Sequence, residues 1–331
     1  MKPVSRAVLC LALGTAGALA QSVISARSGM LHYVEGQVFL GDKAVESKFG
    51  NYPEVKENGT LRTEAGRAEI LLTPGVFLRL GENSGIRMVT NRLVDTRLEL
   101  LTGSAVVEAD DILKDNSVTV VYKDTTTHLL KKGLYRFDAS PAALRVFEGE
   151  AGVAGADPAV EVKDGKMIAL DSSLTVAKFD KNETDTLDRW SRRRGEYVAM
   201  ANVSAANSIR RSGTSWLSSG WAFNPYFGMF TFVPMNGSYY SPYGYRFWSP
   251  MAVYQLYRPR PVFMGGGYGG GGYNNAGYRS MPQTSSGYSG VIASAPSVSA
   301  PAAHAPSTSS AGAASAPVSR GGGSSGGGAH R

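Results

Sequence analysis

The sequence has a single cysteine, Cys10, among 331 residues. Cys10 lies in an apolar run close to the N-terminus, so the rest of the chain has no thiol for a disulfide, a thiolate metal site or a nucleophile. Long apolar runs are also lacking, because after the first twenty residues no stretch approaches the roughly 18 continuous apolar residues of a membrane-spanning helix. We therefore expect packing alone to stabilise the mature protein.

The N-terminus has the layout of a secretory signal peptide. Lys2 and Arg6 precede the apolar run AVLCLALGTAGALA, which ends in the small-residue cleavage pattern ALA. Cleavage is predicted between Ala20 and Gln21. We expect residues 1–20 to be removed, and the mature chain to be periplasmic or secreted without a transmembrane segment.

Acidic residues are missing from the C-terminal part of the chain. Glu196 is the last acid, and eight arginines follow it. Residues 27–180 hold 19 Lys and Arg against 23 Asp and Glu, whereas residues 181–331 hold 13 against 4. A basic tail on a mildly acidic body attracts polyanions such as lipid headgroups, acidic glycans or nucleic acid. Export makes nucleic acid the least favoured of these partners.

Catalytic and metal-binding signatures are lacking as well. None of the four histidines has the HxxxH or HExxH spacing of a metal site, so His32 and His128 are expected to be ordinary strand residues. Neither a G-x-S-x-G nor an S-x-x-K motif occurs. Glu148 and Glu150 would share a strand face and could imitate a glycosidase pair, which leaves a hydrolase as one alternative. The prediction is a non-enzymatic protein without cofactor or metal.

Residues 28–180 show the period of two that is typical of half-buried strands. In GVFLRL, Val76, Leu78 and Leu80 fall on one face, and Gly, Asn, Asp or Pro separates such runs. The segments VEGQVFL (34–40), LTGSAVVEA (101–109) and FEGEAGVAG (147–155) each place a glycine before an alternating strand. The pattern predicts an all-β domain of short, mainly antiparallel strands in a roll, sandwich or solenoid.

Several motifs follow one another in this region. They are GTLRT (59–63), AEILL (68–72), PGVFLRLGENS (74–84), LELLTGSAVV (98–107), GLYRF (133–137) and LRVFEGEAGV (144–153). In order and spacing they resemble the core of the bacterial FecR domain, over about residues 30–170. The resemblance implies a role in extracytoplasmic sensing or in interaction with envelope proteins. The best-known members carry a cytoplasmic segment and a membrane span, and here a signal peptide stands in their place. We therefore expect binding or scaffolding within the envelope.

Residues 181–210 have the 3.6-residue period of an amphipathic helix. Asp180 and Glu183 resemble a capping box, which predicts a helix from 182 to about 208 that covers an open end or edge of the β domain. Arg192–Arg194 is expected to be a solvated face, and Gly195 weakens the pattern. Leu187, Trp190, Arg194, Tyr197 and Ala201 recur at three- and four-residue steps as one helix face, and Leu187 and Trp190 are expected to lie over the β domain.

Residues 211–263 form an aromatic, Pro- and Gly-rich segment with half of the chain's aromatic side chains. It is interpreted as a belt packed on the β domain, as a cell-wall or polysaccharide-binding surface, or as a self-association segment. Residues 264–331 are rich in Gly, Ser, Tyr, Ala and Pro, a composition that predicts a disordered tail capable of weak self-association. The candidate interaction surface consists of Trp216, Trp221, Tyr226, Phe227, Tyr239, Tyr240, Tyr243, Trp248, Arg246, Arg258 and Arg260.

Overall fold

The computed structural model describes residues 28–46, 50–112, 115–155, 159–171 and 174–257. The predicted signal peptide with Ala20 and Gln21, the predicted tail, and Arg258 and Arg260 lie outside these residues. Contacts within the chain separate Met1–Phe263 from Met264–Arg331. All that follows concerns the described residues of the first unit.

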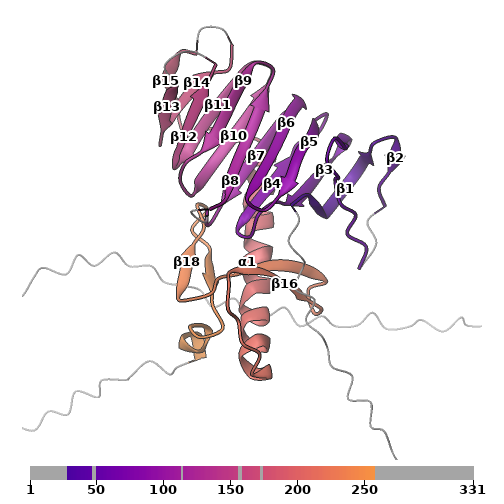
Figure 1. Ribbon diagram of the computed structural model, residues 1–331, viewed down its shortest axis with the longest axis vertical. Coiled ribbons are helices and arrows are strands. Elements are labelled where there is room, and N and C mark those ends of the chain that lie inside the picture. The colour runs from indigo at the N-terminus through magenta and orange to yellow at the C-terminus, as the bar shows by residue number, and fades with distance from the viewer. Residues whose placement is uncertain (1–27, 47–49, 113–114, 156–158, 172–173, 258–331) are drawn as a thin grey trace, which may run out of the picture. The chain divides into compact units, whose positions relative to one another are not determined.

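Fifteen strands in the described part of the chain form one continuous sheet, which confirms the all-β prediction (Figure 1). The sheet doubles back on itself at β1 (Met30–Leu40) and β3 (Thr60–Leu71), two long antiparallel partners. The first residues of β3 pair with β5, and its last residues pair with β4. A short strand, β2 (Lys43–Ala44), extends the edge beside β1.

Each half of the sheet contains six further strands. One half contains β5 (Gly85–Arg92), β6 (Asp95–Thr102), β8 (Ser117–Tyr122), β9 (Thr125–Leu129), β12 (Glu150–Ala154) and β13 (Val160–Lys163). The other contains β4 (Val76–Leu80), β7 (Ser104–Ala109), β10 (Gly133–Ala139), β11 (Ala142–Glu148), β14 (Lys166–Ala169) and β15 (Val176–Lys178). The pairs are antiparallel except β6 with β8. One hydrophobic cluster joins residues of both halves, so they pack face to face.

Two of the three recurring glycines mark places where the chain crosses from one half to the other, whereas the third, Gly36, lies inside β1 and does not precede a strand. Gly103 lies between β6 and β7, and Gly149 lies between β11 and β12. Both have positive φ, at 72° and 101°. A Cβ at Gly103 would overlap Ser84, and one at Gly149 would overlap the Tyr135 side chain. Glycine is therefore required at both crossings for steric as well as conformational reasons.

Strands β4 and β7, most of β10 and the last residues of β3 are buried on both faces. Their inward residues, such as Leu78 and Val107, join the core between the two halves. Their outward residues, such as Phe77 and Glu108, are equally buried because the following helix and hairpins cover them. The predicted helix therefore covers an outer face of the sheet, and the expectation that it covers an open end or edge is wrong.

Helix α1 (Thr186–Ser212) begins four residues later than predicted. The capping box is formed by Asp185 and Asp188, and not by Asp180 and Glu183. The Arg136 guanidinium on β10 binds the carboxylates of both capping-box residues, at 2.6 Å from Asp185 and 2.7 Å from Asp188. Since both acidic pairs suit a helix start, this contact with the sheet is what selects between them.

The buried face of α1 repeats at three and four residues, as predicted, with one difference in register. Val198 is buried, whereas Tyr197 has 53% of its surface exposed. Arg192 and Arg193 are solvated as predicted, but Arg194 is buried against the sheet. Gly195 allows a close approach, because a Cβ there would lie 3.3 Å from a carboxylate oxygen of Glu108 and 3.2 Å from the Tyr243 ring.

The aromatic segment folds into two hairpins and a 3-10 turn that pack on α1 (Figure 1). Thr231 and Asn224 donate hydrogen bonds to helix carbonyls, and Asn202 on the helix binds Phe232 and Trp248. The elements are β16 (Gly220–Asn224), β17 (Met229–Val233), β18 (Ser238–Tyr240), β19 (Arg246–Trp248) and η1 (Val253–Tyr257). Among the described residues, no helix combines the length and apolar character needed to cross a bilayer.

Candidate functional site

A row of buried charged side chains crosses the outer face of the sheet beneath α1. Glu69 on β3 lies at its centre and binds Arg79 Nε on β4 at 2.7 Å and Arg194 Nη2 on α1 at 2.8 Å. Arg79 Nη1 continues the row to Glu108 on β7, at 2.5 Å. Burial acts to raise the pKa of Glu69, but the two arginines outweigh it and hold that pKa well below its usual range.

His32 ties the row to the aromatic segment. The Phe230 backbone N–H donates to His32 Nε2 at 3.0 Å, so the ring proton lies on Nδ1, which donates to Glu69 at 2.8 Å. Burial lowers the pKa of His32, which keeps the ring neutral. Because both ring nitrogens are engaged within the fold, His32 serves β1, β3 and β17 as a structural connector.

Asp110 lies at the end of the row, two residues after Glu108, and unlike Glu108 it has no cation bound to its carboxylate in the described part of the chain. Both of its carboxylate oxygens are buried without a hydrogen-bond partner among the described residues. Burial first, and then the neighbouring Glu108, raises the pKa of Asp110 well above its usual range. The folded protein therefore holds a proton that the unfolded chain would have released above pH about 3.9.

We expect Asp110→Asn to stabilise the protein at neutral and alkaline pH by about 1–2 kcal/mol. The wild type loses stability as pH rises through the raised pKa of Asp110, and the amide has no charge to bury. Urea unfolding at several pH values should show an advantage that grows from pH 4 upward. The exposed Asp42→Asn should show none. A constant difference at all pH values would mean that Asp110 does not titrate in this range.

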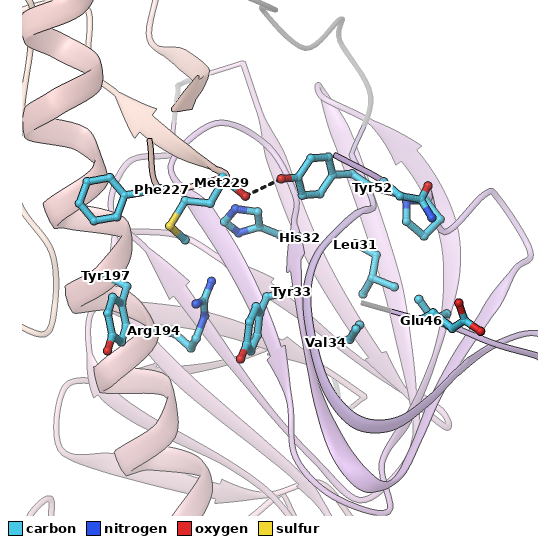
Figure 2. A pocket seen from close by; sticks show the side chains of 14 residues that line it. Leu31, His32, Tyr33, Val34, Glu46, Tyr52, Arg194, Tyr197, Phe227 and Met229 are labelled. Atoms are coloured by element: carbon cyan, nitrogen blue, oxygen red, sulfur yellow. Dashed lines mark hydrogen bonds between the residues drawn. The ribbon is translucent and has the colours of Figure 1, made fainter. Parts of the chain in front are cut away.

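A surface cleft opens beside this row, between β1, the segment 50–53, α1 and β17 (Figure 2). Its volume is about 520 Å³. The Arg194 guanidinium lies 4.0 Å from the centre of the Tyr33 ring, in a cation–π contact. The Tyr52 hydroxyl donates to the Gly228 carbonyl at 2.6 Å, and the Tyr52 ring packs against Phe230 at 5.1 Å between centroids. The cleft therefore has aromatic walls held at fixed positions.

A second hollow continues the cleft towards β2. It has a volume of about 300 Å³ and is lined by Leu40, Lys43 and Ala44. The two hollows share Val45, Glu46, Asn51 and Pro53. We call this continuous feature the β1–α1 groove. It leads from the edge strand β2 to the exposed ring of Tyr197 on α1.

The groove draws mostly on residues that the sequence did not mark as an interaction surface. Among the predicted interaction residues that the structure describes, Phe227 alone lines it. The signal for the others was weak, because Tyr33, Tyr52 and Tyr197 are scattered over 164 residues and the fold brings them together. Alternation along residues 30–40 and the pair Tyr52-Pro53 were the features that could have indicated them.

The fold distributes the predicted interaction residues between interior and surface. Trp221 and Trp248 are buried, and the Tyr243 hydroxyl reaches Ser191 Oγ at 2.7 Å. Arg246 stacks on Trp248 at 3.8 Å. The half-buried members are Trp216, Phe227, Tyr239, Tyr243 and Arg246, and the exposed members are Tyr226 and Tyr240. The segment is in part the packed belt of the first interpretation, and its outer rings remain available for contact.

Glu148 and Glu150 do not share a strand face. Gly149 separates them at a crossing, so that Glu148 ends β11 and Glu150 begins β12 in the other half of the sheet. Glu150 binds Lys131 at 2.6 Å, and this hydrogen bond lowers the pKa of Glu150. Because the two residues belong to strands in different halves of the sheet, the shared strand face expected of a glycosidase pair is not formed.

Comparison with known proteins returns solved structures alone. No protein-family model matches the chain, and no curated protein matches it. Two crystal structures of a "putative anti-sigma factor" from Parabacteroides distasonis ATCC 8503, at 2.50 and 1.65 Å resolution, are similar over 40% of this chain, with 11% identity and a TM-score of 0.31. The chain spans 62% and 63% of those structures. At this level the likeness says nothing of activity or partners, and membership of the FecR family stays a prediction.

Proposed function

We propose that this chain is a non-enzymatic protein of the cell envelope, periplasmic or secreted, which binds an extended segment of another envelope protein in the β1–α1 groove. By doing so it acts in extracytoplasmic sensing or scaffolding. The observation that carries the proposal is the groove itself, an aromatic-walled cleft that shares lining residues with a hollow beside the edge strand β2. Its export is supported by the N-terminal sequence.

The chemistry of the groove suits a peptide. Edge strand β2 can pair with an added main chain, since its only partner in the described part of the sheet is β1. Aromatic residues, methionine and arginine are enriched at the cores of protein interfaces, and Tyr33, Phe227, Met229 and Arg194 line the groove. At its inner wall Arg194 and His32 are both engaged with Glu69, which favours binding over catalysis.

The test is photo-crosslinking in cells that export the protein. A benzophenone amino acid replaces Tyr197 at the groove or, as the matched control, Tyr240 on β18; these side chains are 53% and 56% exposed. We expect a discrete, protease-sensitive adduct from position 197 and not from 240. Adding Phe227→Ser should weaken it about tenfold, because an aromatic wall is lost.

Two results would count against this proposal. A muramidase-sensitive adduct would show that the groove binds a cell-wall glycan instead of a protein. That glycan is the alternative partner inferred from the aromatic segment. Equal labelling from positions 197 and 240, unaffected by Phe227→Ser, would show that the groove holds no partner.

A further inference from the structure

A second surface, far along α1 from its N-terminal cap, combines exposed apolar and cationic side chains. Leu217 has 83% of its surface exposed and Met251 has 73%. Together with Arg210, Trp216 and Met235 they line a hollow of about 340 Å³. We call these five residues the helix-end patch. It shares no residue with the β1–α1 groove.

The patch is held on an ordered base. The Trp216 indole N–H donates to the Val233 carbonyl at 3.2 Å, and the Met235 N–H donates to Ser219 Oγ at 3.1 Å. Beneath them lies a buried cluster that includes Ile209 and Trp248. The exposed apolar side chains are therefore presented by the fold, and side chains placed in this way usually meet a partner.

The charged side chains of this surface are all positive. Arg210 and Arg211 are both exposed in the last turn of α1. No Asp or Glu occurs anywhere in the chain after Glu196, so no carboxylate from the hairpins or η1 neutralises them. Nearby cations without acids favour a polyanionic partner over a protein surface of mixed charge.

We infer that the helix-end patch docks on the surface of a bilayer that contains anionic lipid. Leu217 and Met251 enter the interface, the Trp216 ring lies at headgroup level, and Arg210 and Arg211 contact phosphates. Apolar insertion and basic attraction are the two signals that together give stable peripheral binding. An anionic glycan would use the arginines but would leave Leu217 and Met251 in water, which is why lipid is the better match.

The experiment is vesicle flotation with the full mature chain. Vesicles of phosphatidylcholine alone are compared with vesicles that also contain phosphatidylglycerol. We expect binding to the mixed vesicles only, weakened by added salt because the charges are exposed. The pair Leu217→Ser and Met251→Ser should lower the partition coefficient at least roughly tenfold. Arg210→Gln and Arg211→Gln should each lower it roughly fivefold.

The matched control is the pair Val94→Ser and Leu130→Ser, which removes side chains of 57% and 50% exposure from the β domain. It should leave binding unchanged. Full binding by the Leu217→Ser and Met251→Ser protein would overturn the inference, because these apolar side chains would then contribute nothing to binding. If the wild type bound purified sacculi but not vesicles, the partner of the patch would be a wall polymer and not lipid. If the wild type did not bind vesicles but sedimented as a dimer, and Leu217→Ser with Met251→Ser abolished that dimer, the partner of the patch would be a second copy of the chain.

Discussion

Glu69→Gln should lower the free energy of unfolding by roughly 3–5 kcal/mol. Glu69 is fully buried and contacts Arg79, Arg194 and His32 together. Removing its charge leaves two buried guanidinium groups with Glu108 as the remaining carboxylate partner, at Arg79. Breaking a buried pair on one side costs far more than the pair contributes when it is intact.

The measurement is urea unfolding followed by tryptophan fluorescence and by far-UV circular dichroism. Trp190 lies in α1, Trp221 and Trp248 lie in the hairpins, and Trp216 lies in the segment between α1 and β16, so fluorescence reports on this part of the fold while dichroism follows the sheet. We expect the fluorescence transition to move furthest, because Glu69 joins the sheet to α1. The control is Glu64→Gln, which removes a half-exposed partner of Arg62 and should cost no more than about 1 kcal/mol.

The pH dependence has a definite sign. The pKa of Glu69 is depressed in the folded protein, so its contribution is complete above the unfolded value of about 4.3 and is lost as pH falls through the folded value. Wild type and Glu69→Gln should therefore converge in stability in acid. If their difference stays constant from neutral pH into strong acid, Glu69 is not ionised in the folded state and the charge row is misassigned.

Asn202→Ala should release the second hairpin from the helix at a cost of roughly 3 kcal/mol or more. The buried Asn202 amide donates to the Phe232 carbonyl at 2.8 Å and to the Trp248 carbonyl at 3.0 Å. Its oxygen accepts from the Trp248 N–H at 2.7 Å. Alanine leaves all three backbone groups without these partners, and each unsatisfied buried group costs about 1–3 kcal/mol.

A red shift of the tryptophan emission at low urea, with the dichroism of the sheet retained, is the expected signature. Asn207→Ala is the matched control on the same helix, since the Asn207 side chain accepts one hydrogen bond from Arg210 and lies half-buried. It should change stability by less than about 0.5 kcal/mol. If both variants behaved alike, side-chain burial rather than Asn202 would hold the hairpin on the helix.

The secondary structure was accessible from the sequence because it depends on local pattern. Alternation in GVFLRL placed Val76, Leu78 and Leu80 inward, and that is where β4 holds them. The glycines before residues 104 and 150 were expected to start strands, and both lie at crossings where a side chain would collide. The helix was expected from its 3.6-residue period. The expected face included Tyr197, but the structure buries Val198 instead, because neighbouring faces of a helix are closely spaced.

The charge row could not be predicted by the same reasoning. Along an isolated strand, Glu69, Arg79 and Glu108 alternate with apolar residues and therefore resemble solvated positions. They are buried because residues more than a hundred positions later fold over them. Periodicity within a strand carries no information about a second layer on its outer face. Selection of Asp185 as the cap has the same origin, in Arg136 of a distant strand.

Sequence alone therefore determined the export signal expected for this chain, its all-β character, its single long helix and the absence of acid from its C-terminal part, because each depends on composition or on spacing between near neighbours. The tertiary structure alone decided which aromatic rings are buried, which charged side chains pair beneath α1, and where Tyr33, Tyr52 and Tyr197 meet to form a groove. These features depend on contacts between residues up to 198 positions apart, as between His32 and Phe230, and no local pattern encodes such contacts.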